Sequence, residues 1–292
     1  MVMALNRWLN MIGLCIVLVG SSCKPSNLTT LPGMATKQGG SPVQSPIGQN
    51  PSATKHTLIV FAAASLTGAF QEIGQGFEAI NPGVQMNFNF AGSQILRTQL
   101  EQGAQADVFA PADHKNMSLL VADHLVAANA IQDFATNSLI VILPPSNPGD
   151  VTALADLDRS KLKLVLADES VPAGDYARQV LDKMSQDPNY GVDFSARVLA
   201  NVVSNETDVK QVVAKIELGE ADAGIVYVSD AVAASELTTL SIPANFNVIA
   251  RYPVATLINA QEPKLADAFI AYVNSLEGQA ILAKWGFGTA VR

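Results

Sequence analysis

The stretch Leu58-Ile59-Val60-Phe61-Ala62-Ala63-Ala64-Ser65 decides the fold class of this chain. Its first six residues are all apolar, which is typical of a strand buried on both faces. Apolar residues then recur at helical spacing from Leu66 to Ile80, and Asn81-Pro82-Gly83 ends that predicted helix. A fully buried strand that leads directly into a helix indicates an α/β fold.

The same alternation continues along the rest of the chain. Further strands are predicted at residues 84–90, 107–110, 139–143, 164–167 and 223–227. Helical patterns separate these strands, and a long helical stretch is predicted from Pro263 to Trp285. This spacing predicts mostly parallel sheets that are flanked by helices.

Length and composition limit the class of protein. The chain has 292 residues, of which 49% are hydrophobic and 15% charged, enough apolar material for a core divided over two lobes. The formal net charge is -8, and Lys and Arg form no cluster. Nucleic acid is therefore excluded as an expected partner.

Residues 1–22 are predicted to be a lipoprotein signal peptide. Arg7 precedes an apolar run that is too short to span a membrane, and Gly20-Ser21-Ser22-Cys23 resembles a bacterial lipobox. Residues 23–55 then comprise a lipidated Cys23 and a disordered tether rich in Pro, Gly and Ser. This predicts a protein anchored on the periplasmic or cell-surface side of the membrane. The alternative is an ordinary signal peptide with an incidental cysteine.

Four predicted helix starts carry the candidate binding residues Ser65, Ser93, Ala173 and Val209. Ser93 is expected to cap its helix, and the helix of Val209 is expected to be capped near Asn205 or Thr207. The first turn of a helix leaves backbone N–H groups free, and the macrodipole adds partial positive charge there. Several such ends that converge make an anion site without any Lys or Arg.

Seven short motifs occur in an order that carries a family resemblance. They are Phe61-Ala62-Ala63-Ala64-Ser65-Leu66, Phe90-Ala91-Gly92-Ser93, Ala106-Asp107-Val108-Phe109, Val171-Pro172-Ala173-Gly174, Gly224-Ile225-Val226-Tyr227-Val228-Ser229-Asp230, Tyr252-Pro253-Val254 and Trp285-Gly286-Phe287. Together they resemble the periplasmic molybdate-binding proteins of ABC transporters, over almost all of residues 57–290.

The resemblance implies a two-lobed periplasmic-binding-protein fold with the ligand in a cleft between the lobes. It assigns the oxyanion contacts to the hydroxyls of Ser65, Ser93 and Tyr227 and to the backbone amides of Ala173 and Val209. These groups reach the oxygens of molybdate, so no residue is expected to ligate the metal. Gly92 and Gln94 stand where small hydroxyl residues are common in the family, and Ser93 is the best candidate for the second hydroxyl donor.

Lobe boundaries and partners also follow from the resemblance. The first lobe is expected to comprise residues 56–136 and 251–292, and the second residues 137–250. The hinge is expected near Phe134–Ser138 and Val248–Tyr252. The expected partners are a membrane permease and its ATPase, and the chain is expected to be a monomer without cofactor or enzymatic activity.

A site built only of donors suits molybdate, which carries no proton at neutral pH. Phosphate keeps a proton and needs an acceptor, whereas Asp107, Asp113 and Asp168 are expected to be turn and cap residues. Tungstate has nearly the same size and charge as molybdate. The alternatives are a carrier of another oxyanion such as sulfate or of a small organic acid, a ligand-sensing domain of the same fold, and a hydrolase that uses Ser65.

Two further patterns are interpreted as carrying no function. The stretch Gly74-Gln75-Gly76-Phe77-Glu78-Ala79 matches a dinucleotide fingerprint, but its glycines fall in mid-helix rather than at a strand-to-helix turn. His56, His114 and His124 lack metal-ligand spacing and are expected at the surface.

Overall fold

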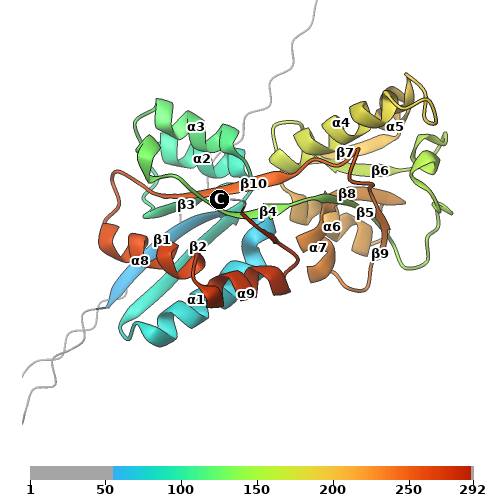
Figure 1. Ribbon diagram of the computed structural model, residues 1–292. Helices are drawn as coiled ribbons and strands as arrows, with labels where there is room; N and C mark the ends of the chain where they lie inside the picture. The colour runs from blue at the N-terminus through green and yellow to red at the C-terminus, as the bar shows by residue number, and fades with distance from the viewer. Residues whose placement is uncertain (1–54, 291–292) are drawn as a thin grey trace, which may run out of the picture. The chain divides into compact units, whose positions relative to one another are not determined.

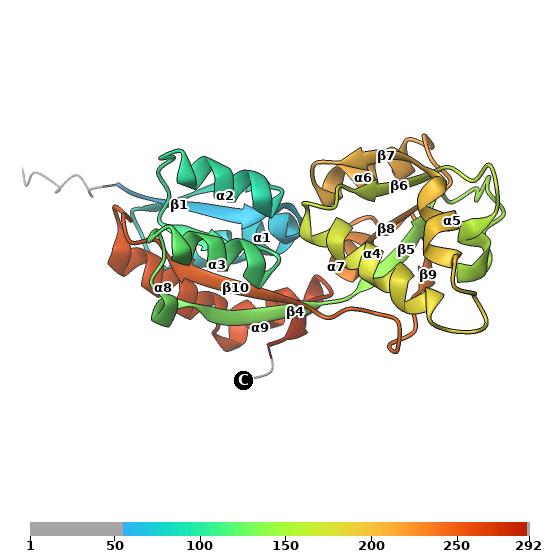
Figure 2. The same cartoon turned by 90° about the horizontal axis from the view of Figure 1, so that it is seen from above.

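The computed structural model describes residues 55–290, which form two mixed β-sheets, each flanked by helices (Figures 1 and 2). The predicted signal peptide and the tether up to residue 54 lie outside the described residues. None of the helices between residues 55 and 290 has the length and apolar character of a membrane span. We refer to the first sheet with its helices as lobe 1, and to the second with its helices as lobe 2.

Lobe 1 holds a six-stranded sheet in the order β11-β4-β10-β3-β1-β2. Its strands are β1 (His56–Ala63), β2 (Val84–Ala91), β3 (Val108–Ala110), β4 (Gln132–Asn137), β10 (Ala250–Thr256) and β11 (Gly288–Thr289). Its helices are the 3-10 helices η1 (Ala64–Leu66) and η2 (Ala128–Ala130) and the α-helices α1 (Thr67–Ile80), α2 (Ser93–Glu101), α3 (His114–Ala122), α8 (Pro263–Val273) and α9 (Leu276–Lys284). The helices α1, α8 and α9 cover one face of the sheet, and α2 and α3 cover the other (Figure 1).

Lobe 2 holds a five-stranded sheet in the order β7-β6-β8-β5-β9. Its strands are β5 (Leu139–Leu143), β6 (Leu164–Ala167), β7 (Val202–Glu206), β8 (Ala223–Tyr227) and β9 (Thr238–Ser241). Its helices are the 3-10 helix η3 (Leu154–Asp158) and the α-helices α4 (Pro172–Ser185), α5 (Phe194–Ala200), α6 (Val209–Glu217) and α7 (Val228–Ala233). Helices α4 and α5 pack together on one face, and α6 and α7 on the other (Figure 2).

The predicted α/β architecture of two sheets flanked by helices is confirmed, with a larger antiparallel share than expected. In lobe 1, β1 pairs in parallel with β2 and β3, whereas β10 and β11 make antiparallel pairs. In lobe 2, β6 pairs in parallel with β7 and β8, whereas β5 pairs antiparallel with β8 and β9. The reason is the chain path: β4 leaves lobe 1 and β10 returns to it, so the two neighbours run in opposite directions.

The predicted helical stretch from Pro263 to Trp285 consists of two helices, because the chain breaks it at Asn274 and Ser275. Ser275 caps α9, and its hydroxyl accepts a hydrogen bond from the Gly278 backbone N–H at 3.2 Å. A Cβ at Gly278 would lie 2.3 Å from the carbonyl oxygen of Tyr272, so the close turn between the helices requires glycine. Apolar periodicity continues through such a break because both helices pack on the same sheet.

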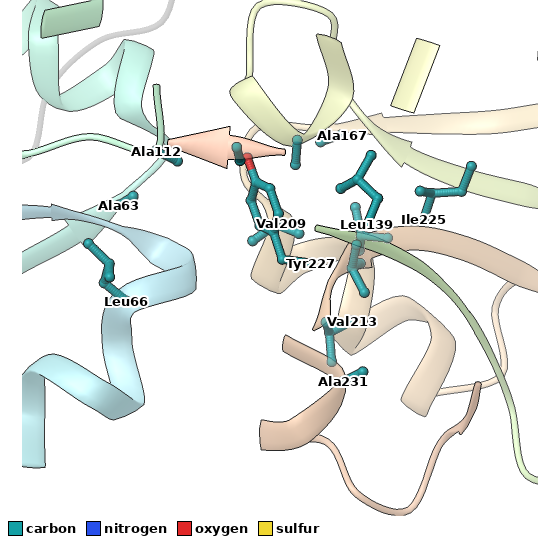
Figure 3. Packing of buried hydrophobic residues seen from close by; sticks show 14 of the residues in the cluster. Ala63, Leu66, Ala112, Leu139, Ala167, Val209, Val213, Ile225, Tyr227 and Ala231 are labelled. Carbon is teal, nitrogen blue, oxygen red and sulfur yellow. The ribbon is translucent and has the colours of Figure 1, made fainter. Parts of the chain in front are cut away.

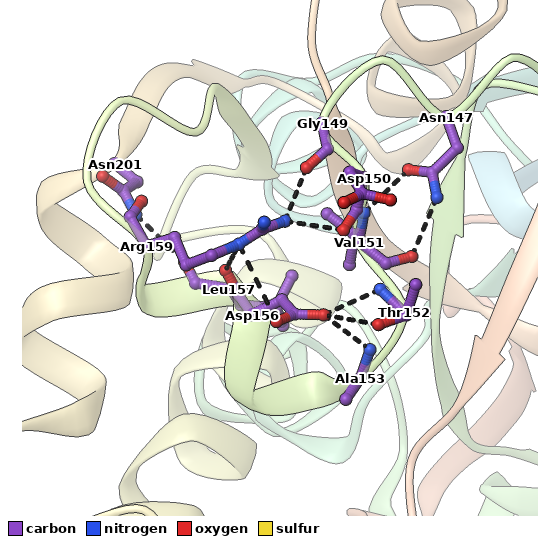
Figure 4. A network of polar contacts seen from close by, with 10 residues as sticks. All are labelled: Asn147, Gly149, Asp150, Val151, Thr152, Ala153, Asp156, Leu157, Arg159 and Asn201. Carbon is purple, nitrogen blue, oxygen red and sulfur yellow. Dashed lines mark hydrogen bonds and ion pairs between the residues drawn. The ribbon is translucent and has the colours of Figure 1, made fainter.

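The loop that follows β5 is ordered by polar contacts within itself (Figure 4). The Asn147 side chain accepts a hydrogen bond from the Val151 N–H and donates one to the Val151 carbonyl, each at 3.0 Å. The Asp156 carboxylate accepts from the backbone N–H groups of Thr152 and Ala153 at 2.8 Å, and these bonds lower its pKa. Arg159 donates to the Asp150 carbonyl at 2.8 Å. This loop therefore serves the fold of lobe 2.

The dinucleotide-like glycines and the three histidines lie at the positions expected for residues without a binding role. Gly74 and Gly76 are in the middle of α1, far from the turn that a dinucleotide fold requires. His56, His114 and His124 are exposed. Among residues 55–290, no group of three His, Cys, Asp or Glu side chains is arranged to hold a metal ion.

Candidate anion-binding site

A small cavity lies between the two lobes, and all five predicted binding residues line it. The volume open to the centre of a water-sized sphere is about 10 Å³, so the cavity suits an ion rather than a larger molecule. Its lining comprises Ala63, Ala64, Ser65, Ala91, Gly92, Ser93 and Ala112 from lobe 1 and Val171, Pro172, Ala173, Asp208, Val209 and Tyr227 from lobe 2. This lining contains no Lys or Arg side chain.

Lobe 1 contributes two buried serines. Ser65 lies in η1, directly after the buried strand β1, and its side chain is 5% exposed. Ser93 is 1% exposed, and its hydroxyl accepts a hydrogen bond from the Ala112 N–H at 3.0 Å. That bond uses a lone pair of the Ser93 oxygen and leaves its proton free to donate.

The prediction that Ser93 caps its helix is wrong. Gly92 occupies the cap position and Ser93 is the first residue of α2. The Ser93 hydroxyl is not bonded to its own helix, because it faces the Ala112 amide instead. Ser93 therefore lines the cavity from the first turn of α2 with a hydroxyl that its own helix does not use.

Lobe 2 contributes the starts of two helices. Helix α4 begins at Pro172, and Ala173 follows in its first turn, where backbone N–H groups have no partner within the helix. A Cβ at Gly174 would lie 2.0 Å from the Asp168 carbonyl oxygen, so glycine lets α4 start against β6. Helix α6 begins at Val209, whose side chain is 3% exposed.

The predicted cap of α6 near Asn205 or Thr207 is wrong, because Asp208 occupies that position. Its carboxylate accepts a hydrogen bond from the Gln211 N–H at 3.1 Å. Asn205 lies in β7, which continues to Glu206. The sequence analysis predicts no strand at these residues, and because β7 extends to Glu206 the cap of α6 lies at Asp208.

Tyr227 ends β8, and its ring lies beside Val209 at the cavity (Figure 3). The side chain is 1% exposed, and its hydroxyl oxygen has no hydrogen-bond partner among residues 55–290. Burial raises the pKa of Tyr227 well above the ordinary tyrosine value, so the hydroxyl keeps its proton. The cavity therefore contains a buried donor that nothing in the described chain satisfies.

The carboxylates near the cavity are held by other groups. Asp113 caps α3, as predicted, and accepts from the Asn116 N–H at 2.9 Å, although burial raises its pKa. The buried Asp230 carboxylate lies 3.1 Å from the Lys210 ammonium, and burial raises the pKa of Asp230 despite that cation. These carboxylates are therefore engaged by other groups. Positive potential at the cavity comes from the helix starts and hydroxyls, because the lining contains no Lys or Arg side chain.

Asp107 and Asp168 also make the structural contacts expected of them. Asp107 accepts from the backbone N–H groups of Ile59 at 2.8 Å and Gln261 at 2.7 Å, which ties β1 to the start of α8. Asp168 accepts from the Ser170 N–H at 3.0 Å in the turn before α4. Neither residue lines the cavity.

The two lobes touch directly beside the cavity. The Gln94 side-chain amide in α2 donates to the Thr207 carbonyl of lobe 2 at 2.8 Å. A Cβ at Gly92 would lie 2.4 Å from the same carbonyl oxygen. Gly92 and Gln94 are therefore residues at which the lobes approach each other.

Tyr252 lies at the site, although the sequence analysis assigned it no binding role. The Tyr252 hydroxyl of β10 lies 3.0 Å from the Ser65 hydroxyl. The two residues are 187 positions apart, and no spacing rule relates them. Only the pairing of β10 with β3, the neighbour of β1, brings them together.

The chain is similar in sequence to known binding proteins. Residues 58–288 match the family model described as bacterial extracellular solute-binding protein. The chain is 40% identical over 256 residues to a molybdate-binding protein of Mycobacterium tuberculosis, and the alignment covers 87% of this chain and 92% of that one. It is 32% identical over 248 residues to a molybdate-binding protein of Escherichia coli, with coverage of 82% and 92%. These matches confirm the resemblance that the ordered motifs indicated.

The fold is also similar to solved structures. The periplasmic molybdate-binding protein of Azotobacter vinelandii matches with a TM-score of 0.69 at 20% identity, over 80% of this chain and 100% of that one. Identity at this level concerns the fold alone, and it confirms the predicted periplasmic-binding-protein fold.

Proposed function

Because the chain belongs to the family of bacterial extracellular solute-binding proteins, we propose that it captures molybdate, and tungstate with it, for delivery to an ABC importer. The family consists of binding proteins rather than enzymes, so the prediction that the chain is not an enzyme is confirmed. The expected partners are the importer's permease and its ATPase.

The observation that carries the proposal is the unsatisfied Tyr227 hydroxyl in a cavity walled by donors from both lobes. We assign the oxyanion contacts to the hydroxyls of Ser65, Ser93 and Tyr227 and to the backbone amides of Ala173 and Val209. A dianion without protons accepts from all of them. Hydrogen phosphate needs an acceptor for its proton, and the Asp208 carboxylate in the lining already caps α6.

Calorimetry of the chain without residues 1–54 tests the ligand. Molybdate and tungstate are expected to bind at least 100-fold more tightly than sulfate or phosphate, which is on the order of 3 kcal/mol in binding free energy. The physical reason is that a rigid ring of donors fits one ion size, and a smaller ion reaches only some of them. Equal affinity for sulfate and molybdate would make the chain a carrier of the sulfate type.

We also propose that Cys23 carries a lipid that holds the protein on the outer side of the membrane. The proposal rests on the sequence Gly20-Ser21-Ser22-Cys23, which lies outside the described residues. Cys23→Ala is expected to release the full chain from the membrane fraction or to block its processing, as measured by fractionation and mass spectrometry. Normal cleavage with retention in the membrane would contradict a lipid at this cysteine.

A further inference from the structure

Tyr252 contacts the candidate binding residue Ser65 but does not itself line the cavity. Its side chain is fully buried, and its hydroxyl lies 3.0 Å from the Ser65 hydroxyl, while Tyr252 itself is absent from the lining. Its ring packs edge-on against Phe134, Tyr227 and Phe287, with ring centres 6.2, 5.9 and 5.4 Å away. These contacts fix the ring, so the hydroxyl cannot move away from Ser65.

The direction of this hydrogen bond decides whether Ser65 can bind an anion. Each hydroxyl has one proton, and either oxygen can donate in the 3.0 Å pair. If Ser65 donates to Tyr252, only lone pairs of the Ser65 oxygen face the cavity, and they repel a dianion. If Tyr252 donates to Ser65, the Ser65 proton is free for the anion.

The acidity of the two hydroxyls favours the useful direction. A phenolic hydroxyl is a stronger acid than an aliphatic hydroxyl and is therefore the stronger hydrogen-bond donor. Burial raises the pKa of Tyr252 above the ordinary tyrosine value, so the Tyr252 oxygen keeps its proton. Tyr252 then donates to Ser65 across the 3.0 Å contact.

We propose that Tyr252 is a positioning residue that holds the Ser65 hydroxyl as an obligate donor to the bound oxyanion. This inference rests on the proposed function, because it concerns the same site. The Tyr252 proton takes one lone pair of the Ser65 oxygen, so the Ser65 proton is left free to be donated to the anion.

A double-mutant cycle tests the inference, with Tyr252→Phe, Ser65→Ala and the double variant measured by calorimetry. Tyr252→Phe keeps the packed ring and removes only the hydroxyl. In the otherwise unchanged chain we expect it to weaken molybdate binding roughly 3- to 10-fold, as for the loss of one neutral hydrogen bond. In the Ser65→Ala background we expect no further loss, because Tyr252 acts only through the serine.

The cycle separates positioning from packing. An equal loss in both backgrounds, or no loss in the unchanged chain, overturns the inference. Urea unfolding of each variant verifies that the protein is folded.

Failure of the proposed function stays distinguishable from failure of the inference. Sulfate is titrated alongside molybdate, and the cycle is evaluated with the anion that the unchanged protein binds more tightly. Tighter binding of sulfate than of molybdate rejects the molybdate proposal, and the double-mutant cycle can still be measured with sulfate. Full coupling between the two substitutions supports the positioning role with either anion.

Discussion

The Tyr227 hydroxyl is expected to favour anion binding but to lower the stability of the ligand-free protein. A buried polar group without a partner costs roughly 1–3 kcal/mol. Tyr227 lies at the end of β8, and its buried hydroxyl has no hydrogen-bond partner among residues 55–290. The Tyr272 hydroxyl also lacks a partner among residues 55–290, so the position of Tyr227 in the cavity lining is what makes it informative about function.

Tyr227→Phe is therefore expected to raise the free energy of unfolding of the ligand-free protein by about 1 kcal/mol. The same change should weaken molybdate binding by roughly 10- to 150-fold, the cost of losing a hydrogen bond to a charged group. Urea unfolding and calorimetry measure the two quantities. Tyr272→Phe, in α8 and outside the cavity, is the matched control and should leave affinity unchanged. A destabilised Tyr227→Phe variant would mean that the hydroxyl is already satisfied in the free protein.

At the scale of elements, the start of α6 supplies a backbone donor rather than a side chain. Val209 is the first residue of the helix, and Asp208 before it is extended, with φ of -156° and ψ of 167°. Proline is tolerated at the first helical position, and the residue before a proline prefers an extended backbone. The backbone N–H of Val209 can therefore be deleted by substitution without breaking the helix.

Val209→Pro is expected to weaken molybdate binding roughly 10- to 150-fold, because it removes a donor to a charged ligand. Val209→Ala keeps the N–H and should change affinity only a few-fold, with a stability loss from the smaller buried side chain. Calorimetry and urea unfolding of both variants give the comparison. If Val209→Ala abolished binding in a folded protein, recognition by the helix start would be refuted.

The junction of β7 with α6 is also held by an ion pair. The Glu206 carboxylate lies 2.7 Å from the Lys215 ammonium, and Glu206 is 7% exposed. Burial raises the pKa of Glu206, but hydrogen bonds from Lys215 and Ser204 outweigh it, so the net pKa is below the ordinary glutamate value. A lowered pKa means that the charged form stabilises the folded state.

Glu206→Gln is expected to cost about 1–3 kcal/mol of unfolding free energy at neutral pH. The contribution of Glu206 is fully present above the unfolded-state pKa of about 4.3 and is lost as the pH falls through the lower folded-state pKa. The stability difference between the two proteins should therefore shrink in acid, as measured by urea unfolding across the range from neutral to acidic pH. A difference that does not depend on pH would show that the charge of Glu206 is irrelevant.

At the scale of the whole molecule, Gly92 limits how closely the lobes approach. A Cβ at this position would meet the Thr207 carbonyl oxygen of lobe 2 at 2.4 Å. Its backbone angles, φ of -58° and ψ of 137°, are ones that alanine adopts without strain. The glycine is therefore required by the contact between lobes and not by the backbone of its own lobe.

Gly92→Ala is expected to leave the free energy of unfolding nearly unchanged and to weaken molybdate binding at least 10-fold, because the donors of the two lobes no longer converge. A 10-fold loss of affinity corresponds to about 1.4 kcal/mol in binding free energy. Calorimetry measures the affinity, and small-angle X-ray scattering with molybdate should give a larger radius of gyration than for the unchanged protein. An unaltered affinity would mean that the lobes bind the anion without this approach.

Local features of the fold and the site could be predicted from the sequence alone. The apolar run of β1 predicted a strand buried on both faces, and residues 60–63 are buried, with Val60 and Ala62 on one face and Phe61 and Ala63 on the other. The turns of strand into helix predicted Ser65, Ala173 and Val209 at helix starts, since these signals lie within a few residues of one another. The family resemblance predicted their assembly, and all of them line one cavity.

Contacts between distant parts of the chain could not be predicted from the sequence and are seen only in the folded structure. The pairing of β10 with β3 and β4 brings Tyr252 to Ser65, and lobe contact brings Gly92 to Thr207. The turn at Ser275 divides the predicted C-terminal helix, and the direction of β4 and β10 makes the sheets mixed. Periodicity reports only which face of an element is apolar, whereas these features depend on which elements meet, and that is set by the packing of residues far apart in sequence.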